Sequence, residues 1–535
     1  MPIVLGTARA LIAAPTADQQ IPAAVAFEAV AIGALPVAFL AAVLGLVAMG
    51  SEYTDDVLSG TFTVSPRRRL VVAAKCLPVL SASFLASLIG LAVAGAIAIA
   101  LLASRDHTDL PVAQVGGIVV AGAVSAALTS VLGVASAALM RSLVGASVQL
   151  ACVLALAPPA IGIAGGPAVQ WLINVLPATA IQAVVTREPA TPFTIEGAPP
   201  STLPWWGGMV VLVVWVLGYL TAALVRIGRR AVLSPESPRR PRKHSTGAAA
   251  TDASTGLRPA NVLRSEVLKL LTLPGARWLL GLSVIVVVTT AVLRTSSLTP
   301  QDVLTEPVLP GDLALVSEQL QAQAISGGIG LVQLLVAFLG VIVFTSEFST
   351  GNIRPTLIAV PRRSLLLLTK LGVVVVAAAC AAIVAYSLAA VLATTFQQRM
   401  GFDVALNAPI VPETILRCTL ATALVAGIGC AFGVLLRTPI AAISAIVAVF
   451  VLSHTALGPL QVLTRGTPLV WLANLDEVFP SAAIAVQNIP ANAYWPHFLV
   501  GDVLQLDPSQ SMMILCVWAV AGGLAGILVF RRRGA

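Results

Sequence analysis

Two polar segments with the same spacing of charged side chains interrupt a chain that is otherwise strongly apolar. Residues 51–75 and 346–370 align without a gap at an offset of 295 positions. Both contain a glutamate, a Pro-Arg-Arg triplet and a closing lysine, at Glu52, Pro66 and Lys75 in the first and at Glu347, Pro361 and Lys370 in the second. Carboxylates and cations at fixed spacing can form ion pairs, contact anionic lipid headgroups or bind a protein partner. The shared spacing predicts that the two segments have one task in common.

The rest of the sequence has no pattern typical of an enzyme or of a metal site. The phosphate-binding pattern G-x-x-x-x-G-K-[ST] is absent, so this chain is not expected to bind ATP by such a loop. The six cysteines form no C-x-x-C pair, and the four histidines show no H-E-x-x-H spacing. We therefore predict no catalytic residue, no metal site and no cofactor in this chain.

Composition places these segments in a membrane protein. Hydrophobic residues make up 58% of the chain and charged residues 10%, whereas about 25% of the residues in a typical soluble domain are charged. Apolar runs of about 20 residues can cross a bilayer, and barrel strands would instead alternate over about ten. The predicted fold class is an all-α polytopic membrane protein with about eleven transmembrane helices. The runs lie near residues 23–49, 76–103, 113–139, 142–165, 205–226, 277–294, 323–345, 366–395, 414–436, 438–460 and 509–530.

The distribution of charge predicts the orientation of these spans. If both polar segments are cytoplasmic, alternation along eleven spans puts most of the 31 Lys and Arg residues inside and most of the acidic residues outside. Cytoplasmic loops are enriched in Lys and Arg, so we predict a multi-pass protein of the bacterial plasma membrane with a cytoplasmic C-terminus. Contact with the bilayer accounts for the basic surplus, and no nucleic-acid partner is predicted.

The duplication continues beyond the two polar segments. Trp171 matches Trp471 on the outer side, and Trp215 matches Trp518 in the last span of each half. Both copies keep their order and orientation, as in parallel repeats. The span near 277–294 has no counterpart in the first half. We therefore expect an ancestral arrangement of six plus six spans in which the first helix is missing, by deletion or by a misassigned start codon; a true eleven-span protein is the alternative.

Three regions follow from this pattern. Residues 1–230 form the first half, with about five spans, and residues 261–535 form the second half, with an interfacial helix and about six spans. Residues 231–260 between them are rich in Pro, Ser and Arg and lack apolar periodicity, which predicts a disordered cytoplasmic linker.

The repeated polar segments admit two interpretations. Ile353 and Leu357 would share one face of a short helix, and Leu58 and Phe62 repeat this spacing. Such a helix, held at the headgroups by Arg362 and Lys370, could dock a soluble partner and pass force to the adjoining spans. A basic turn that only fixes topology is the alternative, but it does not explain the repeated Glu, aromatic and Thr positions, so docking is favoured.

The spans themselves offer little for coupled transport. Glu28 lies near an outer helix end and is only a weak substrate candidate. An ion-driven carrier normally needs an ionisable residue inside its bundle, and none is evident at mid-membrane depth. Energy supplied by another chain is therefore favoured. A secondary carrier with two parallel halves and a membrane scaffold or sensor are the alternatives.

The pattern S-E-[YF]-x4-[IL]-x2-T-x4-P-R-R-x-L-x4-K after a span, together with the segment 263–270 before Trp278, resembles the permease subunits of ABC-2 type exporters. The resemblance covers both halves and implies a tandem fusion of two permease units. In that family the loop after the second span of each unit forms a coupling helix that sits on the ATPase subunit; this maps to residues 52–66 and 347–361. The residues implied to couple to the ATPase are Glu52, Tyr53, Leu58, Thr61, Phe62, Pro66, Arg67, Glu347, Phe348, Ile353, Thr356, Leu357, Pro361 and Arg362.

The resemblance also implies further elements and partners. An amphipathic helix along the cytoplasmic interface maps to residues 261–274 and carries Arg264, Glu266 and Lys269. Short helices that close the exit map to residues 166–204 and 461–507. A separate ABC ATPase, expected in two copies, would hold the ATP and Mg. The implied function is export of an amphipathic or hydrophobic, antibiotic-like compound by alternating access.

Overall fold

The computed structural model describes residues 23–54, 68–103, 112–140, 143–156, 172, 174–186, 203–229, 259–296, 312–349, 356, 363–453, 470–487 and 506–532. The regular elements in this part of the chain are helices throughout. They are α2 (Ala23–Thr54), α4 (Arg68–Ala103), α5 (Val112–Met140), α6 (Leu143–Ala151), η1 (Cys152–Leu156), α9 (Pro177–Thr186), α10 (Trp205–Arg229), α11 (Pro259–Thr272), α12 (Pro274–Ser296), α14 (Asp312–Ser326), α15 (Ile329–Ser349), α17 (Arg363–Arg399), α18 (Ile410–Leu436), α19 (Pro439–Val447), η2 (Ala448–Leu452), η3 (Val470–Val478), α21 (Pro480–Val486) and α22 (Pro508–Arg532).

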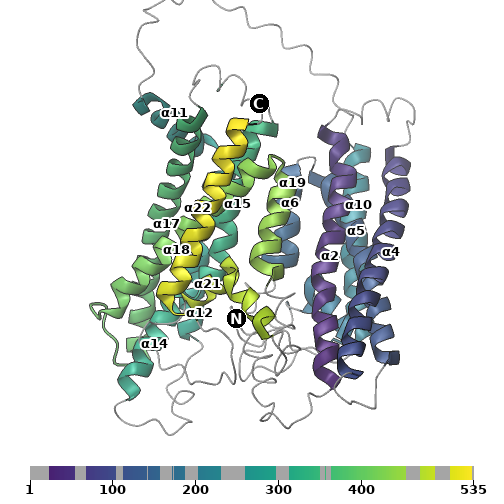
Figure 1. Ribbon diagram of the computed structural model, residues 1–535, viewed down its shortest axis with the longest axis horizontal. Helices are drawn as coiled ribbons and strands as arrows, with labels where there is room; N and C mark the ends of the chain where they lie inside the picture. The colour runs from purple at the N-terminus through teal and green to yellow at the C-terminus, as the bar shows by residue number, and fades with distance from the viewer. Residues whose placement is uncertain are drawn as a thin grey trace, which may run out of the picture.

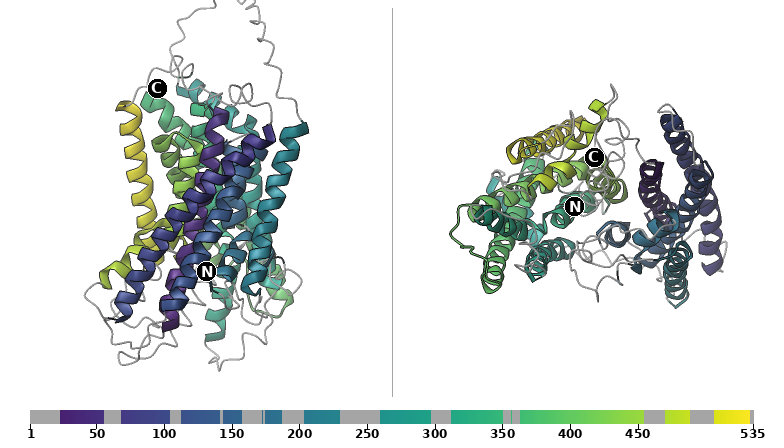
Figure 2. Two further views of the ribbon diagram at one scale, coloured as in Figure 1. Left: turned by 90° about the vertical axis from the view of Figure 1, so that its right-hand side faces the viewer. Right: turned by 90° about the horizontal axis from the view of Figure 1, so that it is seen from below.

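The long helices form two groups that stand side by side. One group contains α2, α4, α5 and α10, and the other contains α12, α15, α17, α18 and α22 (Figures 1 and 2). Between the groups, α6 packs against α19. Each of these two short helices continues into a π-helical turn, η1 and η2. π-helical turns are rare and concentrate at functional sites, and here both lie at the contact between the two groups.

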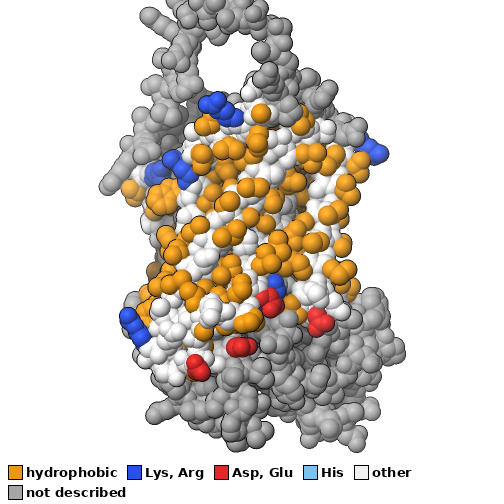
Figure 3. Space-filling view, turned by 90° about the vertical axis from the view of Figure 1, so that its left-hand side faces the viewer, with side chains coloured by type: hydrophobic (Ala, Val, Ile, Leu, Met, Phe, Trp, Pro, Cys, Tyr) orange, Lys and Arg blue, Asp and Glu red, His pale blue; other side chains and the backbone are white. Residues whose placement is uncertain are grey.

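The apolar helices are those of a polytopic membrane protein. Eight helices in the described residues are long and apolar enough to cross a bilayer, and three shorter apolar helices lie at 34–50, 145–154 and 439–451. Each of the eleven predicted spans falls on one of these helices, while the number of actual crossings stays a prediction. Figure 3 shows one face of the molecule, with apolar side chains over its middle, basic side chains toward its upper end and both acidic and basic side chains near its lower end.

Close helix crossings at glycine hold the centre of each group. At the α15–α18 crossing, a Cβ on Gly340 would lie 2.5 Å from the Cys430 backbone nitrogen, and one on Gly429 would overlap the Ala337 carbonyl oxygen. At the α2–α5 crossing, Gly45 and Gly133 lie against the facing backbone in the same way. Lipid tails are as apolar as leucine, so helices in a bilayer associate through such close packing and not through the hydrophobic effect.

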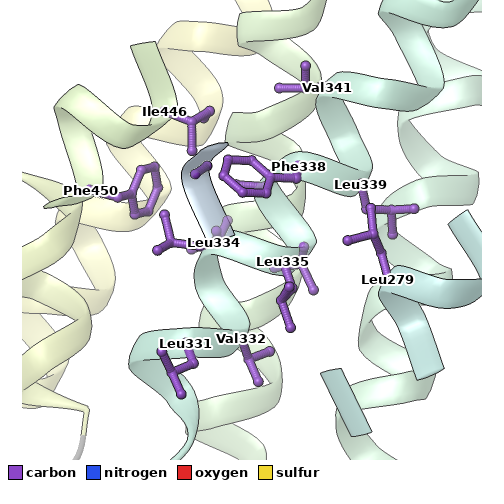
Figure 4. Packing of buried hydrophobic residues seen from close by; sticks show 14 of the residues in the cluster. Leu279, Leu331, Val332, Leu334, Leu335, Phe338, Leu339, Val341, Ile446 and Phe450 are labelled. Carbon is purple, nitrogen blue, oxygen red and sulfur yellow. The ribbon is translucent and has the colours of Figure 1, made fainter. Parts of the chain in front are cut away.

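Larger side chains fill the space around the α15–α18 crossing. In Figure 4, Phe338, Leu334 and Leu331 project from α15, which is buried along nearly its whole length. Ile446 of α19 and Phe450 of η2 approach it from one side, and Leu279 of α12 lies against Leu339 on another. The core of this group is therefore centred on α15.

The short helices α9 and α21 pack against the last long helix of their groups, α10 and α22. In the first group, the indole nitrogen of Trp215 on α10 donates to the Val175 carbonyl at 2.6 Å, just before α9. In the second, Trp518 on α22 donates to the Val478 carbonyl at 2.8 Å, just before α21. These bonds tie α9 and α21 to the last long helix of their groups, within the segments for which short helices were predicted.

Replacing Gly429 with valine is expected to lower the unfolding temperature of the purified protein, because α15 and α18 could then pack only by separating. Overpacking of a core costs about 1–3 kcal/mol, occasionally more. The measurement is the fraction of monodisperse protein left after heating in detergent. Gly372→Val in α17 is the matched control, because no atom lies within 4 Å of its added Cβ. Equal unfolding temperatures for the two variants would contradict the assigned role of the crossing.

Candidate functional site

The second polar segment joins the ends of two long helices next to α11. Residues 346–349 form the last turn of α15, and α17 begins at Arg363. On the same side, α11 packs against α17 and is separated from α12 by Leu273 alone. Four elements therefore meet at this end of the molecule, which we call the α11 end.

Sequence spacing explains why α11 lies where it does. Its helix begins at Pro259, a residue favoured at the first helical position. Val262, Glu266 and Leu270 follow at intervals of four residues and are buried, because residues so spaced share one face of a helix. Val262 packs against Leu366 of α17. The buried face of α11 thus places the Glu266 carboxylate between two buried apolar residues of the same face, Val262 and Leu270.

That carboxylate belongs to a four-residue ion-pair network. Lys269 Nζ lies 2.7 Å from Glu266 Oε1 and 3.1 Å from Glu347 Oε1. Lys370 Nζ lies 2.6 Å from Glu347 Oε2 and 3.6 Å from Glu266 Oε2. Each lysine therefore bridges the same two carboxylates, and the network joins α11, the end of α15 and the start of α17.

The two lysines differ in burial. The Lys370 side chain is 4% exposed, donates to the Val343 carbonyl at 3.4 Å and lies 5.3 Å from the centroid of the Phe344 ring. The Lys269 side chain is 44% exposed. Partial burial opposes protonation of Lys269, but hydrogen bonds and charge from Glu266 and Glu347 outweigh it and raise its pKa. Lys370 is thus the buried cation of the network, and its removal would leave the Glu347 carboxylate without its closest partner.

Phe348 is held within the same end of the second group. Its ring packs edge-on against Phe530 of α22, with centroids 6.4 Å apart, and the Arg437 guanidinium lies 5.5 Å from its centroid. Arg437 caps α18 with a φ of 59°, a left-handed conformation common just after a helix end. The last turn of α15 is therefore fixed to α22 and α18 as well as to α11.

The structure brings together some of the predicted site residues. Glu347 and Phe348 of the coupling set join Glu266 and Lys269 of the interfacial helix, while Arg264 is exposed on α11 and Thr356 is half-buried. Glu28, Glu52 and Tyr53 lie on α2, where the structure describes their backbone and not their side chains. The predicted residues outside the described part are Leu58, Thr61, Phe62, Pro66, Arg67, Ile353, Leu357, Pro361 and Arg362.

Sequence reasoning missed the role of Lys370. It was expected at the lipid headgroups, but its side chain is buried between two carboxylates. The sequence shows that the spacing from Glu to Lys is the same in both polar segments. It does not show that each lysine donates to a backbone carbonyl of the preceding long helix. Lys75 Nζ donates to the Ala48 carbonyl at 3.4 Å, and Lys370 Nζ donates to the Val343 carbonyl at the same distance.

Neither a known protein-family model nor a curated protein sequence matches this chain.

Replacing Lys370 with methionine is expected to destabilise the protein more than replacing Lys269 with methionine. Breaking a buried ion pair by removing one partner costs about 3–5 kcal/mol, whereas exposed ion pairs contribute about 0–1 kcal/mol. The measurement is the unfolding temperature in detergent. Arg264→Met, which removes an exposed charge from α11, should leave this temperature nearly unchanged. A Lys370→Met variant as stable as Arg264→Met would refute the network's structural role.

Proposed function

We propose that this chain is the membrane-spanning subunit of an ATP-driven exporter of the ABC-2 type, with ATP hydrolysed by a separate ATPase. The ATPase would bind the polar segments at the α11 end and hold ATP and Mg itself. Closure of the ATPase would then switch the space between the two groups of helices from inward to outward access.

The ion-pair network is the observation that carries this proposal. It joins α11, α15 and α17 at the two ends of residues 346–370. A partner that pushed on this segment would therefore move α15 and α17 together with α11 and, through Leu273, α12. Rigid junctions of this kind transmit displacement because packed helices shift as units. Glu347 and Phe348 would act in this transmission, since their side chains are engaged within the chain.

Recurring contacts support two permease units and hence two ATPase copies. The lysine-to-carbonyl bonds of Lys75 and Lys370 are both 3.4 Å long. The bonds donated by Trp215 and Trp518 both span 40 residues of sequence. Among the described residues, each group also has a central glycine crossing, and each of the two facing helices α6 and α19 continues into a π-helical turn. Two parallel repeats would present two docking segments at the same end of the molecule.

The charge distribution supports the orientation that this function requires. Lys75, Arg277 and Lys370 lie near the starts of α4, α12 and α17, and Arg532 ends α22; Figure 1 shows these helix ends at the α11 end. Asp403, Glu413 and Asp507 adjoin the opposite ends of α17, α18 and α22. Cytoplasmic ends of spans are rich in Lys and Arg. We therefore place the α11 end and the C-terminus in the cytoplasm of a bacterial cell, where the ATPase would be.

The composition of the spans supports a hydrophobic or amphipathic cargo. The long helices that face the boundary between the groups carry few ionisable residues, which would disfavour recognition of a strongly charged compound. An antibiotic-like molecule fits this chemistry.

The test is affinity purification of the chain from its source membranes, followed by mass spectrometry for an ATPase with the phosphate-binding loop that this chain lacks. Replacing Ile353 and Leu357 with aspartate is expected to abolish co-purification of the ATPase, because two charges would enter an apolar docking contact. Leu406→Asp is the matched control, because Leu406 is exposed between α17 and α18 at the opposite end of the molecule, and this variant should retain the ATPase.

The same double substitution at Leu58 and Phe62 tests the first segment. Loss of about half of the bound ATPase is expected if each segment holds one copy. Recovery of no such ATPase with the unchanged chain, or equal recovery with the Ile353 and Leu357 variant, would overturn the proposed function.

A further inference from the structure

The exposed surface of α11 contains an apolar stripe. Leu263, Val267 and Leu271 follow one another at intervals of four residues, so they share one face of the helix. Each of them comes directly after a residue of the buried face, and each is exposed. Apolar side chains left in water forgo the stabilisation that burial provides, so an apolar neighbour along this stripe would stabilise α11.

The charged side chains exposed near the stripe are basic. In α11 and α12 the exposed charged residues are Arg264, Lys269 and Arg277, whereas Glu266 is 3% exposed. Lys269 and Glu266 belong to the ion-pair network, and the two arginines do not. On the face seen in Figure 3, the charged side chains toward the upper end are likewise basic. α11 therefore presents positive charge next to exposed apolar surface.

The start of α12 places α11 at the level where the chain enters the bilayer. Trp278 is 78% exposed, and Leu282 and Ile285 follow it at intervals of four and three residues and are also exposed. α12 is one of the helices long and apolar enough to cross a membrane, and Trp is enriched where hydrocarbon meets the headgroups. Because Leu273 alone separates α11 from α12, α11 lies next to the headgroup layer.

We propose that α11 binds the headgroup phosphates of anionic lipids through Arg264 and Arg277, while its apolar stripe contacts the acyl chains. The occupant is a lipid surface because the stripe adjoins the exposed apolar side of a membrane-crossing helix, and because the exposed charge beside it is positive. Helices with an apolar face and basic side chains bind membranes in this way, and arginine donates two hydrogen bonds at once to phosphate oxygens. This inference goes beyond the exporter proposal and does not depend on it.

Such binding would hold α11 from two sides. The ion-pair network joins α11 to α15 and α17 through Glu266 and Lys269, and the lipid would hold the stripe and the two arginines. A neutral lipid supplies only the apolar contact, whereas an anionic lipid adds attraction to each nearby basic residue. The headgroup charge of the surrounding lipid would therefore decide how firmly α11 is held.

The experiment uses the full chain in phosphatidylcholine nanodiscs that contain a trace of lipid with a photoactivatable group in its acyl chain. This chain is carried on phosphatidylglycerol, which is anionic, in one sample and on phosphatidylcholine, which has no net charge, in the other. Adducts on residues 259–278 are quantified by peptide mass spectrometry. Phosphatidylglycerol is expected to give the higher yield, by about fivefold for each arginine that contributes.

A double substitution tests the two arginines. Arg264→Gln together with Arg277→Gln is expected to bring the two yields close together, because glutamine keeps a long polar side chain and removes the charge. Arg399→Gln is the matched control, since Arg399 is exposed in the last turn of α17 at the opposite end of the molecule, and it should leave the ratio unchanged. The double variant should also keep the unfolding temperature of the unchanged chain in detergent, which separates lost selectivity from lost folding.

Equal yields from the two lipids with the unchanged chain would overturn the proposal, because lipid would then cover the stripe without regard to its headgroup. A preference for phosphatidylglycerol that survives the double substitution would overturn the assignment to Arg264 and Arg277. Absence of adducts on α11 with both lipids would also overturn the proposal and would indicate that a protein covers this helix.

These outcomes are separate from the ATPase test, which measures co-purification. If the lipid preference is absent while the ATPase still co-purifies, only the lipid proposal falls. If the preference is found and no ATPase is recovered, only the exporter proposal falls.

Discussion

The arrangement of the helices depends on how closely their backbones approach at two crossings. In a bilayer the helices gain nothing by hiding leucine from lipid, so contacts between small residues must hold them together. Gly340 and Gly429 provide this contact between α15 and α18, and Gly45 and Gly133 provide it between α2 and α5. Every other long helix in a group packs around one of these pairs.

The ion-pair network adds a second kind of constraint at the α11 end. Burying Lys370 is costly unless its charge is matched, and two carboxylates match it at 2.6 and 3.6 Å. Those carboxylates come from α11 and from the last turn of α15. Because the buried lysine needs both carboxylates, the network holds α11 to α15 and α17. The proposed partner would act at this junction.

The two groups share their central glycine crossing but differ in how the neighbouring helices pack: α4 packs directly against α2, whereas α17 packs mainly against α12 and α18. α15 is enclosed by α12, α18 and α19, whereas α2 leaves one apolar face open.

The sequence alone determined the apolar helices and the positions of the charged segments. Hydropathy and charge spacing are local properties, and a bilayer favours long apolar runs in its core and charged residues at its surfaces. It also placed Glu266 and Lys269 one turn apart on α11. Only the tertiary structure decided that Glu347, 78 residues beyond Lys269, completes the network and that Lys370 is buried within it. It likewise decided that Leu44 is exposed while Leu339 is buried. Pairing and burial depend on which helices meet, and residues of the same type in matching positions differ only in what covers them.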